Sequence, residues 1–173
     1  AKSRKATKVH DASFTDMPKG GEARLVKTPE ERINMARHHT GTHLIHEALR
    51  HVLGDHVFQA GSLVDIDHLR FDFTHFKQVN DEQLKEIEKI VNDKINENLT
   101  VDATTTTLEK AKEKGAMALF GEKYDEHNVR VISIGDYSLE LCGGHHVAST
   151  EEIQSIKIIN ESAVAAGTRR IEA

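Results

Sequence analysis

The sequence predicts an α+β fold in which a mostly antiparallel sheet has one long helix packed across it. Apolar residues recur at helical spacing over residues 29–53. Several short segments instead alternate apolar and polar residues or are rich in β-branched residues, and glycine-containing turns separate many of them. Strands joined by short turns, with helices set apart from them, are typical of the α+β class.

The long helix is expected to run from Pro29 to about Leu53. Thr28 offers a capping hydroxyl, Pro29 takes the first helical position, and acidic residues follow in the first turn. Gly54 comes directly after the last apolar residue of the pattern and is expected to end the helix.

The other elements are shorter. Residues 1–28 mix charges with glycine and proline and indicate only short strands and a turn. We expect an extended segment over 56–67 with a bulge or a close backbone approach at Gly61, and a second helix capped by Asn80 or Asp81. Strands are expected over 69–73, 101–107, 129–134, 137–141, 155–160 and 168–171, with a short helix over 108–114.

The composition narrows the class of protein. A chain of 173 residues with 38% hydrophobic content suits one globular domain, with or without a small appendage. No apolar run approaches the ~20 residues that span a bilayer, so we expect no membrane contact. The single cysteine cannot form an internal disulfide, which fits a reducing cytoplasm. A net charge of −5 argues against non-specific coating of nucleic acid, although local phosphate contacts stay possible. The start at Ala1 suggests a piece of a longer protein.

Two pairs of side chains suggest a metal site. His39 and His43 are four residues apart and therefore share one face of the long helix. Cys142 and His146 repeat this spacing much later in the chain, and the Gly143-Gly144 pair between them permits a sharp turn with positive φ. Together the four would give the tetrahedral nitrogen and sulfur shell that Zn²⁺ favours.

The neighbouring histidines fit the site less well. His38 points roughly 100° away from His39 around the helix and should miss the ion. His145 could replace or crowd His146, so the ligand register at that end is open. The stretch over 46–51 resembles the HExxH motif of zinc proteases, but its second histidine comes one residue too late. We therefore reject a metalloprotease.

The sequence contains further motifs besides the two pairs of candidate metal ligands, and together they indicate a resemblance to a known family. They are RHHTGTHLIH over 37–46, VLGDHVFQAGS over 52–62, LRFDF over 69–73, KGAMALFGEKY over 114–124, ELCGG over 140–144 and GTRRIEA over 167–173. Over roughly residues 36–173 the chain resembles the editing domain of alanyl-tRNA synthetase and its free-standing trans-editing relatives. The editing domain of threonyl-tRNA synthetase shares the metal pattern more distantly. The AMALFGE stretch over 116–122 favours the alanyl branch.

The resemblance implies a fold and an activity. We expect an editing domain over residues 29–173 that hydrolyses the ester linking serine or glycine to tRNA(Ala). A pocket built for alanine cannot strongly reject glycine or serine, so a second, hydrolytic site is needed. The resemblance also implies a Zn²⁺ cofactor, the charged acceptor end of tRNA(Ala) as partner, covalent attachment to a larger synthetase, and a cytoplasmic location.

Two more residues match family positions tied to editing. Thr42, next to His43, matches a position implicated in discriminating serine from alanine. A polar partner left unpaired by alanine would supply that discrimination, because an unsatisfied buried group costs about 1–3 kcal/mol. Gln59 matches another editing residue. The simpler alternatives are a packed helical threonine and a surface amide.

Some features depart from the family, and the alternatives they raise stay open. The family usually has threonine where this chain has His145, and residues 1–28 match its leading subdomain poorly. Four protein ligands would close the zinc shell, whereas a catalytic zinc keeps one position for water. The metal could therefore activate water or only position the substrate. The rival functions are a catalytically silent tRNA-binding module with structural zinc, and threonyl-type editing of Ser-tRNA(Thr).

Overall fold

The computed structural model describes residues 28–119 and 123–173, so the strands and turn expected over 1–28 fall outside the described part. Its helices are α1 (Pro29–Leu53), α2 (Asp81–Asn96), α3 (Leu108–Glu113) and the 3₁₀ helix η1 (Thr150–Ile153). Its strands are β1 (Gln59–Val64), β2 (Leu69–Thr74), β3 (Val101–Thr106), β4 (Val129–Ile134), β5 (Ser138–Leu141), β6 (Asn160–Ala165) and β7 (Thr168–Glu172). The predicted α+β class is confirmed.

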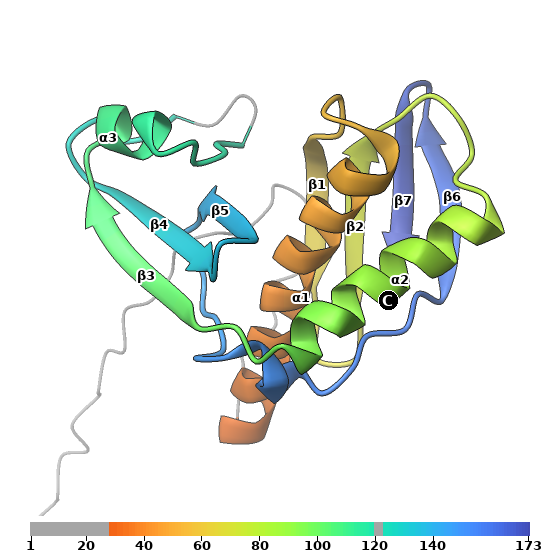
Figure 1. Cartoon of the computed structure of the whole chain (residues 1–173), viewed down its shortest axis with the longest axis horizontal. Coiled ribbons are helices and arrows are strands. Elements are labelled where there is room, and N and C mark those ends of the chain that lie inside the picture. The colour runs from red at the N-terminus through yellow and green to blue at the C-terminus, as the bar shows by residue number, and fades with distance from the viewer. Residues whose placement is uncertain (1–27, 120–122) are drawn as a thin grey trace, which may run out of the picture.

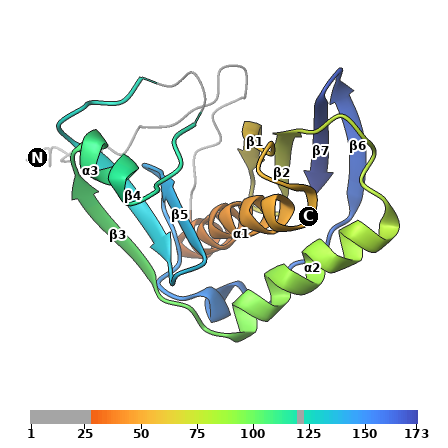
Figure 2. The same cartoon turned by 45° about the horizontal axis from the view of Figure 1, so that its top comes forward.

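The strands form two antiparallel sheets. One has the order β1-β2-β7-β6 and the other the order β3-β4-β5. Figures 1 and 2 show α1 running between the two sheets, with α2 beside it on the same side of the four-stranded sheet. The long helix therefore lies across an antiparallel sheet, as predicted, and also contacts β5 of the second sheet.

Local signals define α1 as the sequence predicts. The Thr28 hydroxyl accepts a hydrogen bond from the Glu31 backbone N–H at 3.1 Å, and the Glu31 carboxylate accepts one from the Thr28 N–H at 2.8 Å. At the other end Gly54 adopts a φ of 122° and closes the helix. Every residue from Thr40 to His46 is buried, because both sheets enclose the middle of the helix.

Two hydrophobic cores meet at β4. Its Val129 and Val131 side chains join a small core with Ala111 of α3, whereas Ile132 and Ile134 join the main core around α1. Successive side chains of a strand point to opposite faces, so β4 is buried on both sides. This burial fixes the three-stranded sheet, and with it the end of β5, against α1.

One predicted strand is wrong. Residues 155–160 were expected to pair, but the strand β6 begins only at Asn160 and uses the small residues expected to form a turn. The reason lies in α2. The Asn92 amide accepts from the Ile156 N–H at 2.9 Å and donates to its carbonyl at 2.8 Å, while Glu88 accepts from the Ile158 N–H at 2.8 Å. Side chains of α2 thus take the hydrogen bonds that a neighbouring strand would otherwise take.

Candidate metal centre

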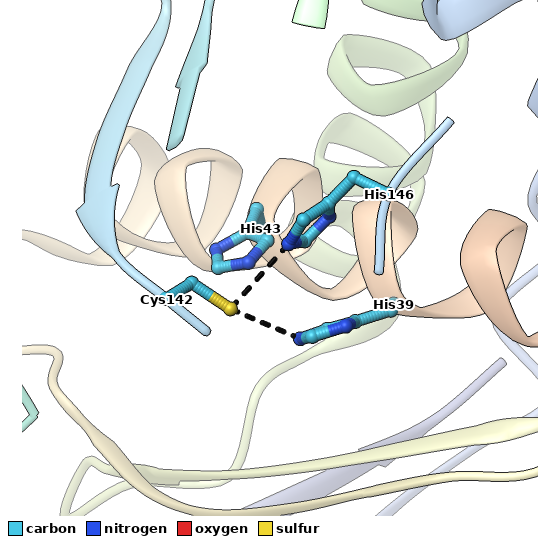
Figure 3. A group of neighbouring side chains, drawn as sticks. All are labelled: His39, His43, Cys142 and His146. Atoms are coloured by element: carbon cyan, nitrogen blue, oxygen red, sulfur yellow. Dashed lines mark hydrogen bonds between the residues drawn. The ribbon is translucent and has the colours of Figure 1, made fainter. Parts of the chain in front are cut away.

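The structure brings the four predicted ligands together. The donor atoms of His39, His43, Cys142 and His146 all lie within 4.8 Å of one another (Figure 3). The Cys142 sulfur is 3.3 Å from His39 Nε2 and 3.4 Å from His146 Nε2. Ordinary zinc bonds at a tetrahedral angle would place sulfur and nitrogen about 3.6 Å apart. The cluster can therefore hold a metal ion and is compatible with zinc.

The fold supplies these side chains from two places. His39 and His43 lie one turn apart on α1. Cys142 follows directly after β5, and His146 lies between β5 and η1. Because β5 packs against α1, the end of that strand delivers the thiol beside the two helical imidazoles.

The glycine turn works differently from the prediction. Neither Gly143 nor Gly144 has a positive φ, so the expected left-handed turn is wrong. A glycine is required at position 144 because there is no room for a side chain: a Cβ there would lie 1.9 Å from Cε1 of His39. The Arg130 guanidinium donates to the carbonyls of Cys142 and Gly144 and holds the turn in place.

Two further side chains orient the imidazoles. His43 Nδ1 lies 2.7 Å from the Glu140 carboxylate, and its Nε2 is buried without a hydrogen-bond partner in the described structure. A histidine that donates through one nitrogen to a carboxylate presents the other nitrogen to a metal. His146 Nδ1 similarly lies 3.1 Å from the Thr40 hydroxyl. Both rings are thus held with Nε2 toward the cluster centre (Figure 3).

The charges at the cluster also fit a cation. Burial would raise the pKa of Cys142, but hydrogen bonds from His146 and His39, together with the nearby His43 ring, lower it to about 3. Burial would likewise raise the pKa of Glu140, and the charge and hydrogen bonds of His43, with His46, hold it well below its usual range. Burial lowers the pKa of His146 to about 4. The negative charges of a partly buried thiolate and a buried carboxylate are stabilised by a positive charge close to both.

In the absence of a metal ion, that positive charge falls on His43. Burial opposes its protonation, but the attraction of Glu140, the hydrogen bond to Glu140 and the nearby Cys142 sulfur raise the pKa of His43 to about 10. A divalent cation would take over this role and leave the imidazole neutral as a ligand.

The other histidines of the motifs lie outside the cluster. His38 turns its buried Nδ1 elsewhere and is not among the clustered donors. His145 is exposed, so His146 is the donor at that end. His51 is exposed, whereas His46 is buried, which agrees with rejecting the HExxH interpretation.

Thr42 and Gln59 occupy different environments. Thr42 is 3% exposed, and its hydroxyl donates to the His38 carbonyl at 2.9 Å, within the helix. Gln59 is half-buried, donates to the Ser62 hydroxyl at 3.0 Å, and lines a small cavity together with His46 and Glu140. Gln59 therefore lies near the group that orients His43, whereas Thr42 does not line that cavity.

Sequence reasoning missed Glu140, His46 and Thr40. A signal existed for the first two. Glu140 precedes Cys142 by two residues, which places both on one side of an extended chain. His46 lies three residues after His43 and shares its helical face. Nothing in the local sequence marks Thr40 as the partner of His146.

Comparisons with known proteins relate the chain to aminoacyl-tRNA synthetases. Residues 129–172 match the family model described as "Threonyl and Alanyl tRNA synthetase second additional domain". An alanine–tRNA ligase of Shouchella clausii is 53% identical over 167 residues, which are 95% of this chain and 19% of the relative. That alignment therefore reaches into residues 1–28. The ligase of Desulforamulus reducens is 58% identical over 142 residues (82% and 16%), and that of Geobacillus kaustophilus 59% over 143 residues (83% and 16%).

Residues 129–172, which include Cys142 and His146, match the second additional domain of threonyl- and alanyl-tRNA synthetases. Within this class, the chain is an alanyl-tRNA synthetase editing-type domain, and the resemblance inferred from the motifs is confirmed. The chain spans less than a fifth of the length of the relative from Shouchella clausii. Among the described helices, none combines the length and apolar character needed to cross a membrane.

Proposed function

We propose that this chain hydrolyses the aminoacyl ester of Ser-tRNA(Ala) and Gly-tRNA(Ala), as the zinc-dependent editing domain of an alanyl-tRNA synthetase. Residues 29–173 form the domain, and the rest of a larger synthetase delivers the charged acceptor end to it. The proposed location is the cytoplasm, where tRNA is charged and used.

One observation carries the proposal: a partly buried set of three imidazoles and one thiol converges in a chain that is 53% identical over 167 residues to an alanine–tRNA ligase. Such a donor set suits Zn²⁺. The described residues offer no other group of three or more metal-ligating side chains at comparable spacing.

His39, His43, Cys142 and His146 would hold the zinc. When bound, the ion supplies Lewis-acid stabilisation of negative charge on an oxygen, or a fixed anchor for the amino group of the substrate. Glu140 keeps His43 in the tautomer that presents Nε2 to the site. Gln59 lines the adjoining cavity, where its amide can contact the aminoacyl group.

A rival function is a tRNA-binding module with a purely structural zinc. The observation that favours it is the number of protein donors, since four close a tetrahedral shell. Threonyl-type editing is the other alternative, because the matched family model covers both synthetases. A single deacylation assay gives a different result for each of these two alternatives.

The test is deacylation by the purified chain, first loaded with one equivalent of zinc and then stripped by a chelator. We expect loss of the aminoacyl group from Ser-tRNA(Ala) and Gly-tRNA(Ala), little action on Ser-tRNA(Thr), and no activity in Cys142→Ala. His51→Ala is the matched control, because it removes an exposed imidazole from the same helix.

A zinc-loaded, folded chain with no deacylation would identify the structural module instead. Preferential action on Ser-tRNA(Thr) would identify threonyl-type editing. Activity that survives both metal removal and Cys142→Ala would overturn the zinc-dependent mechanism.

The proposed role of Thr42 is discrimination between serine and alanine. Thr42→Val keeps the buried shape but removes the hydroxyl, so we expect the preference for Ser-tRNA(Ala) over Ala-tRNA(Ala) to fall by about tenfold. The ratio of the two deacylation rates, with thermal stability as control, measures this. An unchanged ratio would assign the threonine to packing, consistent with its bond to the His38 carbonyl.

A further inference from the structure

His46 is a buried polar side chain with an unused nitrogen. Only 2% of the residue is exposed, and its Nδ1 lies 2.8 Å from the Glu140 carboxylate. Its Nε2 is buried and has no hydrogen-bond partner in the described structure. A buried ring nitrogen without a partner costs about 1–3 kcal/mol, so such an atom points to something that binds there.

A small cavity adjoins this histidine. His46, Glu140 and Gln59 form its polar wall, and Phe58 and residues 117–119 form the rest. Its volume of about 10 Å³ gives room for one water-sized group. The cavity is therefore too small for an amino acid, but large enough for a single hydroxyl.

Glu140 determines which kind of group the cavity accepts. One of its oxygens faces His43 Nδ1 at 2.7 Å and the other faces His46 Nδ1 at 2.8 Å. Carboxylate oxygens accept, so each imidazole donates through Nδ1 and, when neutral, offers Nε2 as an acceptor. On His43 that acceptor faces the metal cluster. On His46 the same arrangement provides an acceptor for an O–H group.

We propose that His46 Nε2 and the Gln59 amide hold one hydroxyl group beside the metal centre. Two sources share this chemistry: the water that attacks the ester, and the side-chain hydroxyl of a mischarged serine. This inference rests on the proposed editing function for its substrates, but the binding of a hydroxyl can be tested without activity.

The inference complements the role expected of Thr42. That hydroxyl already donates its proton within α1. His46 is instead held by Glu140, which also orients a metal ligand, so the hydroxyl site and the metal centre share one support. His46 itself is not one of the four candidate metal donors. A substitution of His46 should therefore change the binding of a hydroxyl group in the cavity and leave those four donors in place.

Two substitutions separate the nitrogen atoms of the ring. His46→Asn retains an amide near Nδ1 that can donate to Glu140 but loses the group at Nε2. His46→Gln retains a polar atom near the Nε2 position. With zinc content and thermal stability measured for both, we expect His46→Asn to lower deacylation of Ser-tRNA(Ala) by about tenfold or more, and His46→Gln to recover part of it.

Deacylation of Gly-tRNA(Ala) distinguishes the two possible sources of the hydroxyl group, the attacking water and the serine side chain. If the hydroxyl belongs to the attacking water, His46→Asn lowers deacylation of Ser-tRNA(Ala) and Gly-tRNA(Ala) alike. If it belongs to serine, the glycine substrate is unaffected. Wild-type rates on both substrates in zinc-loaded His46→Asn would overturn the inference.

A crystal structure of the zinc-loaded chain tests the binding of the hydroxyl group without relying on an activity measurement. We expect an oxygen within hydrogen-bond distance of both His46 Nε2 and the Gln59 amide. A dry cavity, or a protein atom bonded to Nε2, would overturn the inference. A wild-type chain without deacylation would defeat the editing function, and the density at Nε2 would still decide whether a hydroxyl binds.

Discussion

His39 lies so close to the backbone at Gly144 that no side chain fits between them. This contact couples the helical half of the metal centre to the half that follows β5. The Arg130 guanidinium holds the same turn from the other side, through the carbonyls of Cys142 and Gly144. The position of each metal donor therefore depends on residues that are not donors themselves.

Gly144→Ala tests this contact. The new Cβ would lie 1.9 Å from Cε1 and 2.5 Å from Nδ1 of His39, so the imidazole or the turn must shift. Since residues that position metal ligands affect metal affinity by about 10–100-fold, we expect zinc affinity to fall within that range. Competition with a chromophoric chelator measures it. Gly143→Ala, at an exposed neighbour without positive φ, is the control and should bind zinc normally.

Among the elements, α2 and the segment that leads into β6 are joined by side chains rather than by a sheet. Asn92 reaches both backbone groups of Ile156, and Glu88 receives the Ile158 N–H. The buried Ile156 side chain also packs close to Gly41 of α1. This segment therefore connects α2 to the helix that carries the two histidine ligands.

Asn92→Ala removes the hydrogen bonds to Ile156 and leaves its backbone N–H and carbonyl unpaired. We expect a loss of about 1–3 kcal/mol in the free energy of unfolding, measured by urea denaturation. Asn96→Ala, at an exposed position on the same helix, should change stability far less. Equal effects of the two substitutions would mean that the amide bridge contributes nothing specific.

The turn between β4 and β5 is fixed to α1 by Tyr137, whose hydroxyl donates to the Leu44 carbonyl at 2.9 Å. Burial, with the nearby charges of Glu47 and Glu140, raises the pKa of this phenol. Its contribution to stability is therefore complete below the unfolded pKa of about 10 and is lost as the pH rises beyond that value.

Tyr137→Phe should show this pH dependence. At pH 8 we expect the variant to be less stable by about 0.5–1.5 kcal/mol, the usual net value of one hydrogen bond. Between about pH 9 and 11 the wild type should lose stability faster than the variant, so the two unfolding curves converge. Parallel curves across that range would contradict a buried neutral phenol.

At the scale of the whole molecule, a bound metal would link α1 to the segment that follows β5, which no strand pairing in the described structure joins. Two donors belong to the helix between the sheets, and two follow the last strand of the smaller sheet. Unfolding would break this link, so a metal ion held by the cluster would stabilise the folded state.

We therefore expect free Zn²⁺ at about 100 times its Kd to add about 2.7 kcal/mol to the free energy of unfolding. For a chain of this size the midpoint of thermal unfolding should rise by about 5–10 °C. Differential scanning calorimetry with zinc and with a chelator measures the shift. Cys142→Ser should abolish most of it, and a shift of equal size in that variant would place the metal elsewhere.

Much of the fold could be predicted because local signals and tertiary packing agree. Thr28 and Gly54 mark the ends of α1 by their own chemistry, and alternation along β2 reflects its burial. The segment over 155–160 failed because its isoleucines resemble a strand, while Asn92 and Glu88, far away in sequence, provide its hydrogen bonds. The division of the strands between two sheets is likewise a tertiary property that no short stretch encodes.

The two pairs of candidate ligands could be recognised because their four-residue spacings are local. The residues that orient these ligands could not be predicted, since the contact between Thr40 and His146 joins positions 106 residues apart. The sharing of Glu140 by His43 and His46 links positions 97 and 94 residues apart. Gly144 illustrates a different gap: the sequence suggested that the glycine pair permits a turn with positive φ, whereas Gly144 matters because a side chain there would meet His39.

The distance along the chain between the two halves of the metal centre also has a consequence during synthesis. His39 precedes Cys142 by 103 residues, so a ribosome adding about 5–20 residues per second completes the site roughly 5–20 s after its first half emerges. During that interval only two of the four candidate donors, His39 and His43, have been synthesised. If the cluster binds zinc, its complete donor set is therefore available only after His146 has been synthesised.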